Sequence, residues 1–292
     1  MSMKWILRKS SALLLAVFLS ACQTAQAPQG TAQGPAVQTA SLPVVSYAPA
    51  TAVERGFSAL VLNAASGEEL YAVDADAPRF PASLTKMMTL YMLFEAVSSG
   101  KYSLSSPLKI SGNAASQPPA KIGLKAGTTI TVEQAARALA VKSANDVGVT
   151  VAENLGGSET AFAREMTQKA RSLGLKHTRF VNATGLPDSA QVTTARDMAK
   201  LGLALKQRFP QYASYYRAKS FTYNGRTFRA TNNLLGTVSG VDGLKTGYVR
   251  ASGYNLVATA RRGGKKLIVV VMGGKSETAR DKEVTRLIEA YS

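Results

Sequence analysis

The chain has very few of the side chains that form disulfides and metal sites. Its 292 residues include one cysteine, Cys22, and one histidine, His177. A disulfide within the chain is therefore excluded, and a zinc site is not expected because its usual soft ligands are missing. A Ser-His-Asp hydrolase would need the nucleophile elbow G-x-S-x-G, which the sequence does not contain. We expect no metal and no cofactor, and we expect His177 to lie at the surface.

Acidic residues are the second shortage. Lys and Arg number 35 and Asp and Glu number 18, which gives a formal net charge of +17. Such an excess favours a polyanionic neighbour, although solvated Lys and Arg without any partner would give the same count. The export signal described next directs this expectation away from nucleic acid and towards anionic envelope polymers or lipid head groups.

The apolar run near the N-terminus, residues 12–19, is too short to span a bilayer as a helix. It follows a basic head and ends in Leu-Ser-Ala-Cys, the pattern of a secretory signal peptide over residues 1–21. This ending is similar to the lipobox of bacterial lipoproteins, in which cleavage precedes a cysteine that is then acylated. The resemblance implies a lipid anchor on Cys22, with ordinary signal cleavage as the alternative. Gln23 after the cysteine favours the outer membrane, so we expect an exported, periplasmic protein.

The next stretch has no charge at all between Gln23 and Val53. It consists mainly of Gln, Ala, Pro, Thr, Ser and Gly, which predicts a disordered tether over residues 22–53. A flexible chain of this length has a typical end-to-end distance of about 30 Å. Residues 54–292 remain as one catalytic domain that is large enough to bury a sizeable core.

A serine and a lysine three residues apart stand at the start of the most apolar helix that the sequence predicts. Pro81 suits a first helical turn, and the residues after Lys86 are apolar on every face, as in a helix enclosed by protein. Ser83 and Lys86 would be neighbours on this helix, so the pair is a candidate nucleophile with its own base. Taken alone, S-x-x-K favours a capped structural helix.

Two further motifs change that balance. Ser143-Ala144-Asn145 and Lys245-Thr246-Gly247 follow in order, and S-x-x-K, S-x-N and K-T-G together are typical of penicillin-binding proteins and class A β-lactamases. Separately, Ser143 and Asn145 would be more typical of helix caps.

The secondary-structure pattern predicts an α+β fold. A hairpin over residues 56–73 precedes the Ser83 helix, which runs to about residue 99, and residues 101–129 look irregular. Helices are expected near 131–141, 146–155, 159–173 and 194–209, the first opened by a capping box at Thr131. Asn224-Gly225 predicts a hairpin. Strands are expected over 241–248, 254–261 and 267–272, before a last helix from Ser276 or Glu277.

Five segments carry a family resemblance across residues 54–292. PASLTK (81–86), SAND (143–146), NATGLP (182–187), TARDMA (194–199) and GLKTGY (243–248) are similar to the low-molecular-mass penicillin-binding proteins, the serine-type D-alanyl-D-alanine carboxypeptidases. The resemblance implies a five-stranded antiparallel sheet built from both chain ends, flanking helices and a helical lobe, with the site between. Many members also carry a β-rich C-terminal domain and an anchoring helix, which we do not expect here.

The resemblance also implies roles for individual residues. The backbone N–H groups of Ser83 and Tyr248 would form the oxyanion hole, and Lys245 would lower the pKa of Lys86 and attract the substrate carboxylate. Thr246 would donate to that carboxylate, and Gly247 would leave room for a substrate strand. Ser143 would pass a proton to the leaving amine. The other substrate-binding candidates are Asn145, for the peptide amide, and Arg280, for the carboxylate.

The expected activity is removal of the terminal D-alanine from peptidoglycan stem peptides through an acyl-enzyme on Ser83, with β-lactams as covalent inhibitors. Endopeptidase cleavage of D-alanyl cross-links would use the same residues. A β-lactamase would need a deacylating glutamate, but no E-x-x-L-N follows Asn145 at the corresponding distance. The remaining alternative is a wall-binding lipoprotein without catalytic activity.

Overall fold

The computed structural model describes residue 53 and residues 55–292. The predicted signal peptide, Cys22 and the predicted tether apart from residue 53 therefore lie outside the described residues. Among the helices of the described part, none is long and apolar enough to cross a membrane.

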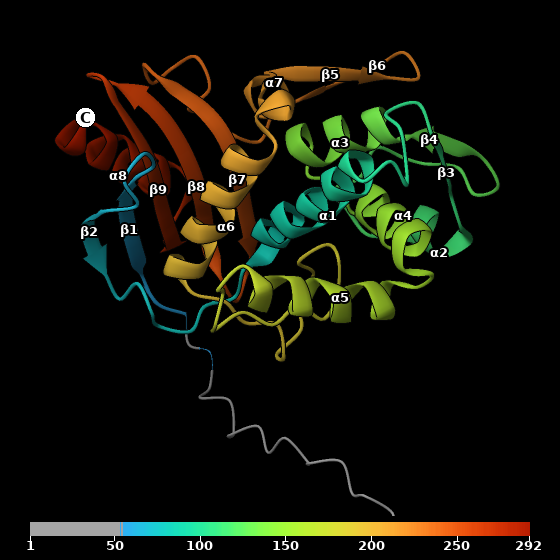
Figure 1. Ribbon diagram of the computed structural model, residues 1–292, viewed down its shortest axis with the longest axis horizontal. Coiled ribbons are helices and arrows are strands. Elements are labelled where there is room, and N and C mark those ends of the chain that lie inside the picture. Colours follow the sequence, from blue (N-terminus) through green and yellow to red (C-terminus); the bar gives the residue numbers. More distant parts are fainter. Residues whose placement is uncertain (1–52, 54) are drawn as a thin grey trace, which may run out of the picture. The chain divides into compact units, whose positions relative to one another are not determined.

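The main sheet has five antiparallel strands and takes them from both ends of the described chain, as the sequence predicted (Figure 1). Its order is β2-β1-β9-β8-β7, so the strand that carries Lys245-Thr246-Gly247 lies at one edge. Two short hairpins, β3-β4 and β5-β6, are separate from it. The strands are β1 Ser58–Asn63, β2 Glu69–Val73, β3 Pro107–Lys109, β4 Thr129–Thr131, β5 Ser220–Tyr223, β6 Arg226–Arg229, β7 Val241–Val249, β8 Gly253–Arg262 and β9 Lys265–Gly274.

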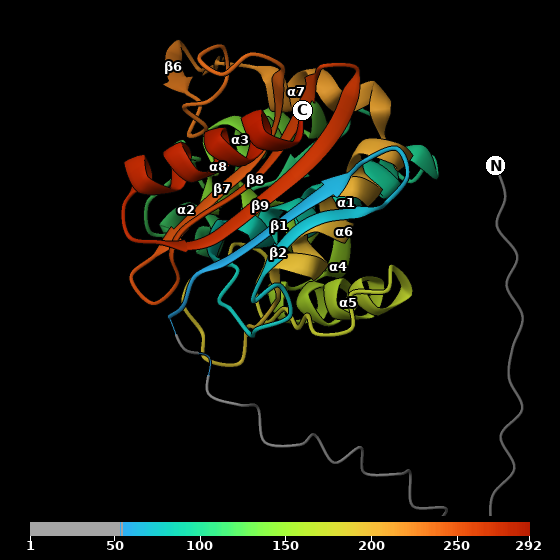
Figure 2. The same ribbon diagram turned by 90° about the vertical axis from the view of Figure 1, so that its left-hand side faces the viewer.

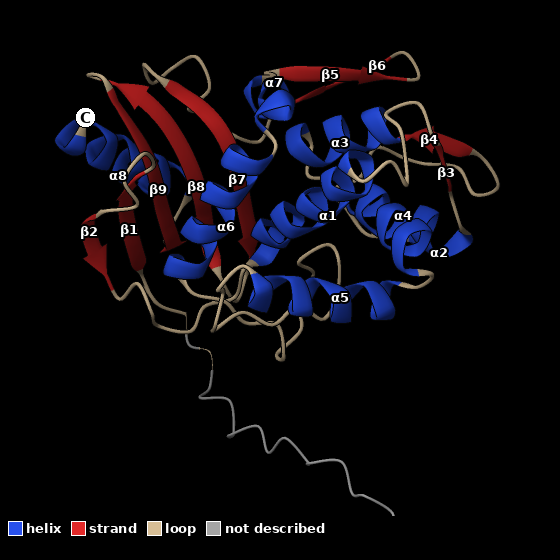
Figure 3. Cartoon of the chain, in the orientation of Figure 1, coloured by secondary structure: helices blue, strands red, loops and turns tan. Residues whose placement is uncertain are grey.

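The helices fall mainly in the middle of the chain, between β2 and β5 (Figure 3). Helix α1 is buried on nearly every side along its first nine residues, which confirms the expectation of an enclosed helix. The helices are η1 Ala82–Thr85, α1 Lys86–Ser98, α2 Gly112–Ser116, α3 Val132–Val141, α4 Asn145–Gly156, α5 Glu159–Ser172, α6 Ala195–Arg208, η2 Pro210–Tyr212, α7 Ala213–Arg217 and α8 Glu277–Tyr291.

Alternate residues of each strand point to the two faces of the sheet, and each face has its own core. Ala59 and Val61 on β1 pack in the cluster that includes Leu287 of α8. Leu60 and Leu62 point the other way, into the larger core that the sheet shares with α6 and the central helices. Figure 2 shows α8 crossing one face of the sheet. This period-2 alternation is what a sheet covered on both faces requires.

The structure differs from the secondary structure that the sequence predicted in two places. Residues 101–129 are not wholly irregular, because they contain β3, α2 and the start of β4. Strands of three residues carry too little periodicity to be recognised. The partner of β3 is β4, which follows α2 and a further loop in the chain. The Ser83 helix also does not begin as an α-helix: Ser83 lies in the 3-10 turn η1, and α1 starts at Lys86.

Candidate active site

The turn that presents Ser83 is fixed by strand β8 and closely approached by strand β7. On β8, the buried Asn255 donates from Nδ2 to the carbonyl oxygens of Phe80 and Pro81, at 3.1 and 3.3 Å. Gly247 lies opposite Asn255 in the β7-β8 register. A Cβ on Gly247 would lie 3.0 Å from the carbonyl oxygen of Pro81 and 3.1 Å from the backbone nitrogen of Ser83. Gly247 is therefore needed for the approach of the Ser83 turn, a reason beyond the room for substrate that the sequence suggested.

A loop from the helical region closes on the other side of the same turn. Gly185 has a positive φ of 82°, and a Cβ there would lie 1.8 Å from the carbonyl oxygen of Ala82. Ala82 itself has a φ of 49°, in the left-handed region that costs a non-glycine residue about 1–2 kcal/mol. The backbone before Ser83 is thus held in an unfavourable conformation between two glycines, which is typical of functional sites.

The side chain of Lys86 is fully buried and has three hydrogen-bond partners. Its Nζ lies 3.1 Å from Ser83 Oγ and 2.8 Å from Asn145 Oδ1, and it also donates to the carbonyl oxygen of Thr184. Two of these partners, the amide oxygen and the carbonyl oxygen, can only accept. The hydroxyl of Ser83 is the one partner that can also donate. When Lys86 is neutral, its two N–H bonds can serve the two acceptors and its lone pair then faces Ser83.

The electrostatics of the site favour that neutral form. Burial lowers the pKa of Lys86 well below its ordinary value, and the nearby charge of Lys245 lowers it further. Two carboxylates, Glu159 and Asp146, act in the opposite direction. Burial, with help from Arg280, also lowers the pKa of Lys245 to about 7. The expected effect of Lys245 on Lys86 is therefore present.

The carboxylate-binding candidates lie on the edge strand β7. The Nζ of Lys245, a side chain 1% exposed, donates to the carbonyl oxygen of Thr246 at 2.8 Å. Thr246 Oγ1 donates to Thr231 Oγ1 at 2.7 Å, which leaves the Thr246 oxygen beside the cleft. Tyr248 is 52% exposed and packs against Tyr254, with ring centroids 4.3 Å apart and ring planes tilted by 32°.

Ser143 and Asn145 occupy the junction between α3 and α4. Ser143 has a φ of 61°, and its buried Oγ has no hydrogen-bond partner among the described residues. Asn145 accepts from Lys86 and donates from Nδ2 to the carbonyl oxygen of Pro118 at 3.0 Å. Asn145 thus positions Lys86, and the second N–H of its amide remains for a substrate peptide. The hydroxyl of Ser143 is available to a substrate peptide.

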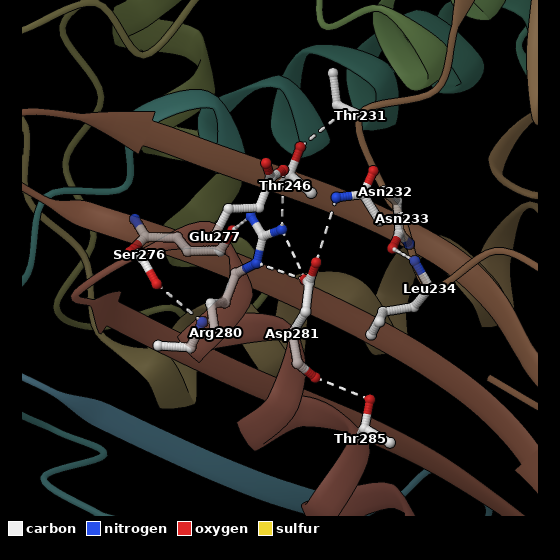
Figure 4. Close-up of polar contacts among 12 residues, drawn as sticks. Thr231, Asn232, Asn233, Leu234, Thr246, Ser276, Glu277, Arg280, Asp281 and Thr285 are labelled. Carbon is white, nitrogen blue, oxygen red and sulfur yellow. Dashed lines mark hydrogen bonds and ion pairs between the residues drawn. The ribbon is translucent and has the colours of Figure 1, made fainter. Parts of the chain in front are cut away.

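Arg280 lines the cleft, and two carboxylates of its own helix, α8, hold its guanidinium. Its Nε and Nη2 lie 2.9 and 2.7 Å from Asp281 Oδ1, and Nη2 lies 3.4 Å from Glu277 Oε1. Figure 4 shows this arrangement, with Asp281 also accepting from Asn233 at 3.3 Å. Arg280 is 2% exposed, so its guanidinium acts on the cleft from beneath the surface.

The residues singled out from the sequence converge on one cleft of about 520 Å³. Lys86 and Lys245 lie behind its wall, and the other candidates line it: Ser83, Ser143, Asn145, Thr246, Gly247, Tyr248 and Arg280. His177 is exposed, as expected, and it does not line this cleft. Within the described chain, no group of three or more His, Cys, Asp or Glu side chains could hold a metal ion.

Sequence reasoning missed the residues that position these groups. Thr184 lies within NATGLP, yet nothing local reveals that its carbonyl accepts from Lys86. Glu159 accepts from the N–H of Ala183 at 3.0 Å and so supports the same loop from behind. Asn255 and Thr231 lie outside the motifs altogether. The register of β7 and β8 brings Asn255 to the site, and Thr231, in the loop after β6, reaches it by its hydrogen bond with Thr246.

Comparisons with known proteins agree with this geometry. A family model described as D-alanyl-D-alanine carboxypeptidase matches residues 46–276. The chain is 38% identical over 238 residues to D-alanyl-D-alanine carboxypeptidase DacA of Escherichia coli strain K12, an alignment that covers 79% of this chain and 59% of that protein. The chain thus spans about three fifths of the length of this curated relative.

Two crystal structures show the same fold. D-alanyl-D-alanine carboxypeptidase DacD from Francisella tularensis matches with a TM-score of 0.78 at 30% identity, covering 80% of this chain and 69% of that one. Penicillin binding protein 5 from Haemophilus influenzae matches with a TM-score of 0.77 at 33% identity, covering 84% and 72%. The fold expected from the sequence is confirmed.

Proposed function

This chain belongs to the D-alanyl-D-alanine carboxypeptidase family, and from that membership we propose that it removes the terminal D-alanine from peptidoglycan stem peptides through an acyl-enzyme on Ser83. The observation that carries the proposal is the set of contacts around Lys86. A buried amine with two obligatory acceptors and one hydroxyl is arranged to take the proton of that hydroxyl.

The proposed reaction has two steps. Ser83 Oγ attacks the carbonyl carbon of the penultimate D-alanine while its proton moves to Lys86, and the C–N bond breaks. The leaving D-alanine amine takes a proton, delivered through the unpartnered hydroxyl of Ser143. Water then attacks the ester, with a lysine amine as base, and releases the shortened peptide and Ser83.

Backbone and side-chain donors support the reacting group. The N–H groups of Ser83 and Tyr248 would stabilise the developing oxyanion, and the close approach of Gly247 to the Ser83 turn brings these two segments together. The hydroxyl of Thr246 would turn from Thr231 to donate to the substrate carboxylate, which the charge of Lys245 would also attract, with Arg280 adding positive charge from beneath.

β-Lactams follow as covalent inhibitors, because they present a strained amide in place of the D-alanyl peptide bond. Of the residues that line the cleft, the one carboxylate is Glu277, which is paired with Arg280. Glu159 lies behind the loop of Ala183 and Thr184, where it accepts from the backbone. Neither is placed to activate water quickly, so we expect a long-lived penicilloyl ester on Ser83 and slow turnover of nitrocefin. Fast nitrocefin hydrolysis would favour a β-lactamase.

The test uses the purified mature protein with two substrates, a pentapeptide ending in D-Ala-D-Ala and a cross-linked dimer. Mass spectrometry should detect release of D-alanine from the pentapeptide, whereas preferred cleavage of the dimer would favour the endopeptidase alternative. Labelled penicillin should map to Ser83, and Ser83→Ala should abolish labelling and turnover together. A protein that neither labels nor cleaves would favour the wall-binding lipoprotein without catalysis.

The cellular location is proposed from the sequence. Cleavage after residue 21 and acylation of Cys22 would leave the domain of residues 54–292 on a tether of residues 22–53, in the periplasm and attached to the outer membrane. Cys22→Ala should release the protein from the membrane fraction or stall its processing. Unchanged fractionation, or a mature N-terminus at another residue, would contradict the lipid anchor.

A further inference from the structure

The positive charge of the chain is segregated. Residues 96–132 contain no Asp or Glu, and residues 198–241 contain none either. The two stretches meet at the cleft, since Pro119 and Ala120 from the first and Thr231 from the second line it. One side of the cleft mouth is therefore built from segments without any acidic residue.

Four basic side chains lie outside the cleft, on the parts of these two stretches that adjoin its lining residues Ala120 and Thr231. Lys125, Arg226 and Arg229 are exposed and Lys121 is half-buried. The loop and the β5-β6 hairpin that carry them are in contact, because a Cβ on Gly123 would lie 3.7 Å from Arg226 Nη1. None of the four forms an ion pair with a carboxylate of the described residues. We name Lys121, Lys125, Arg226 and Arg229 the basic wall.

Hydrogen bonds hold the basic wall in place relative to the cleft. The fully buried carboxylate of Asp146 accepts from the backbone N–H groups of residues 122, 123 and 124, at 2.9 to 3.2 Å. It faces inward, beneath the loop, and is enclosed by these donors. The loop that follows β6 is hydrogen-bonded to β7 through Thr231 and Thr246. The same loop is hydrogen-bonded to α8 through Asn233 and Asp281 (Figure 4).

We propose that the basic wall binds carboxylates of the polymeric substrate that lie outside the cleft, so that the enzyme distinguishes stem peptides within the wall polymer from short free peptides. This inference rests on the proposed function. A stem peptide on a glycan strand would bring the free carboxylates of its own acidic residues and of neighbouring stems to the cleft mouth. Several exposed cations can engage such a polymer at once, and each contact raises the effective concentration of the next.

The expected effect is collective. A single exposed ion pair contributes little, but four together give about a tenfold change in kcat/KM. A short acyl-D-Ala-D-Ala peptide, whose one carboxylate binds inside the cleft, should gain nothing from the basic wall. Because the pairs are exposed, added salt should weaken polymer turnover and leave short-peptide turnover nearly unchanged.

The experiment compares the full chain with the variant Lys121→Gln, Lys125→Gln, Arg226→Gln, Arg229→Gln. The matched control removes four exposed charges on other segments of the chain: Lys101→Gln, Lys176→Gln, Lys265→Gln and Lys266→Gln. Each protein is assayed on uncross-linked wall polymer and on a neutral-flanked acyl-D-Ala-D-Ala peptide, with polyglutamate and polyphosphate as competitors.

The proposal expects the wall variant to lose about tenfold on polymer and less than twofold on the peptide, with polyglutamate inhibiting wild-type polymer turnover more than the variant's. Three results would overturn it: an equal loss on both substrates, an equal loss in the control variant, or inhibition by polyphosphate alone. Absence of peptide hydrolysis by the wild-type protein is a different result, and it would contradict the proposed function itself.

Discussion

Basic side chains serve this cleft from two very different environments. Lys86 and Lys245 lie behind it, 0% and 1% exposed, with fixed partners and lowered pKa values. The basic wall lies outside it, in solvent. Charges buried in a low dielectric act strongly over short distances and depend on exact geometry, whereas exposed charges are screened and act together. The buried pair is therefore suited to chemistry, and the exposed group is suited to attracting a polymer.

Replacing the buried base gives the largest expected effect. Lys86→Arg keeps a cation but does not readily lose its proton, so it separates a base from a simple charge. Acylation of Ser83 by labelled penicillin should slow about 10²–10⁴-fold. Labelling at the wild-type rate would show that another group deprotonates Ser83. The Lys101→Gln protein, altered at an exposed lysine, serves as the control.

The second prediction concerns the hydroxyl on the edge strand. Thr246→Val removes the hydroxyl that would turn from Thr231 to donate to the substrate carboxylate, and hydrogen bonds to charged groups contribute about 1.5–3 kcal/mol, or roughly 10–150-fold. We expect that loss in kcat/KM on free-acid D-Ala-D-Ala peptides and a much smaller one on C-terminal amides. Equal losses on both would mean that Thr246 only maintains the strand through Thr231.

The third prediction is a pH dependence. The pKa of Lys245 is lowered to about 7, so its charge is present below that pH and is lost as the pH rises. Because kcat/KM reports the free enzyme, the preference for free acid over amide should fall up to about tenfold between pH 7 and pH 9. Taking the ratio of the two substrates removes the titration of Lys86, which affects both. A constant ratio over this range would contradict the role of Lys245.

The smallest expected effect comes from the carboxylate behind the Lys86 loop. The charge of Glu159 raises the pKa of Lys86 against the larger effect of burial. Glu159→Gln keeps an acceptor for the N–H of Ala183 and removes that charge, so Lys86 should stay neutral to lower pH. In the pH profile of the rate of penicillin acylation, the acid limb should move to lower pH by less than one unit. Glu159→Ala is the matched variant that also loses the hydrogen bond; an unmoved acid limb in Glu159→Gln would contradict the coupling.

Local sequence predicted those parts of the fold and site that depend on local chemistry. Thr131 and Gln134 form the predicted capping box, and Asn224-Gly225 forms the predicted hairpin turn, with both residues at positive φ. The three-residue spacing of Ser83 and Lys86 likewise predicted their contact.

The rest of the site depends on segments far apart in the chain. Asn255 holds residues 80 and 81, more than 170 positions away, and nothing in its neighbours reveals that partner. The carbonyl of Thr184 is a backbone group, so no side-chain motif could identify it as a partner of Lys86. Strands β3 and β4 were missed because three residues are too few for a recognisable period.

The pairing of β1 with β9 sets when the sheet can form during synthesis of the chain. Roughly 200 residues separate the two strands, and at about 5–20 residues per second a ribosome needs about 10–40 s to make them. During that interval the apolar side chains of β1 have no β9 to pair with, and the Ser83 turn lacks both β7 and β8. The sheet and the Ser83 site therefore cannot be completed until nearly all of the chain has been made.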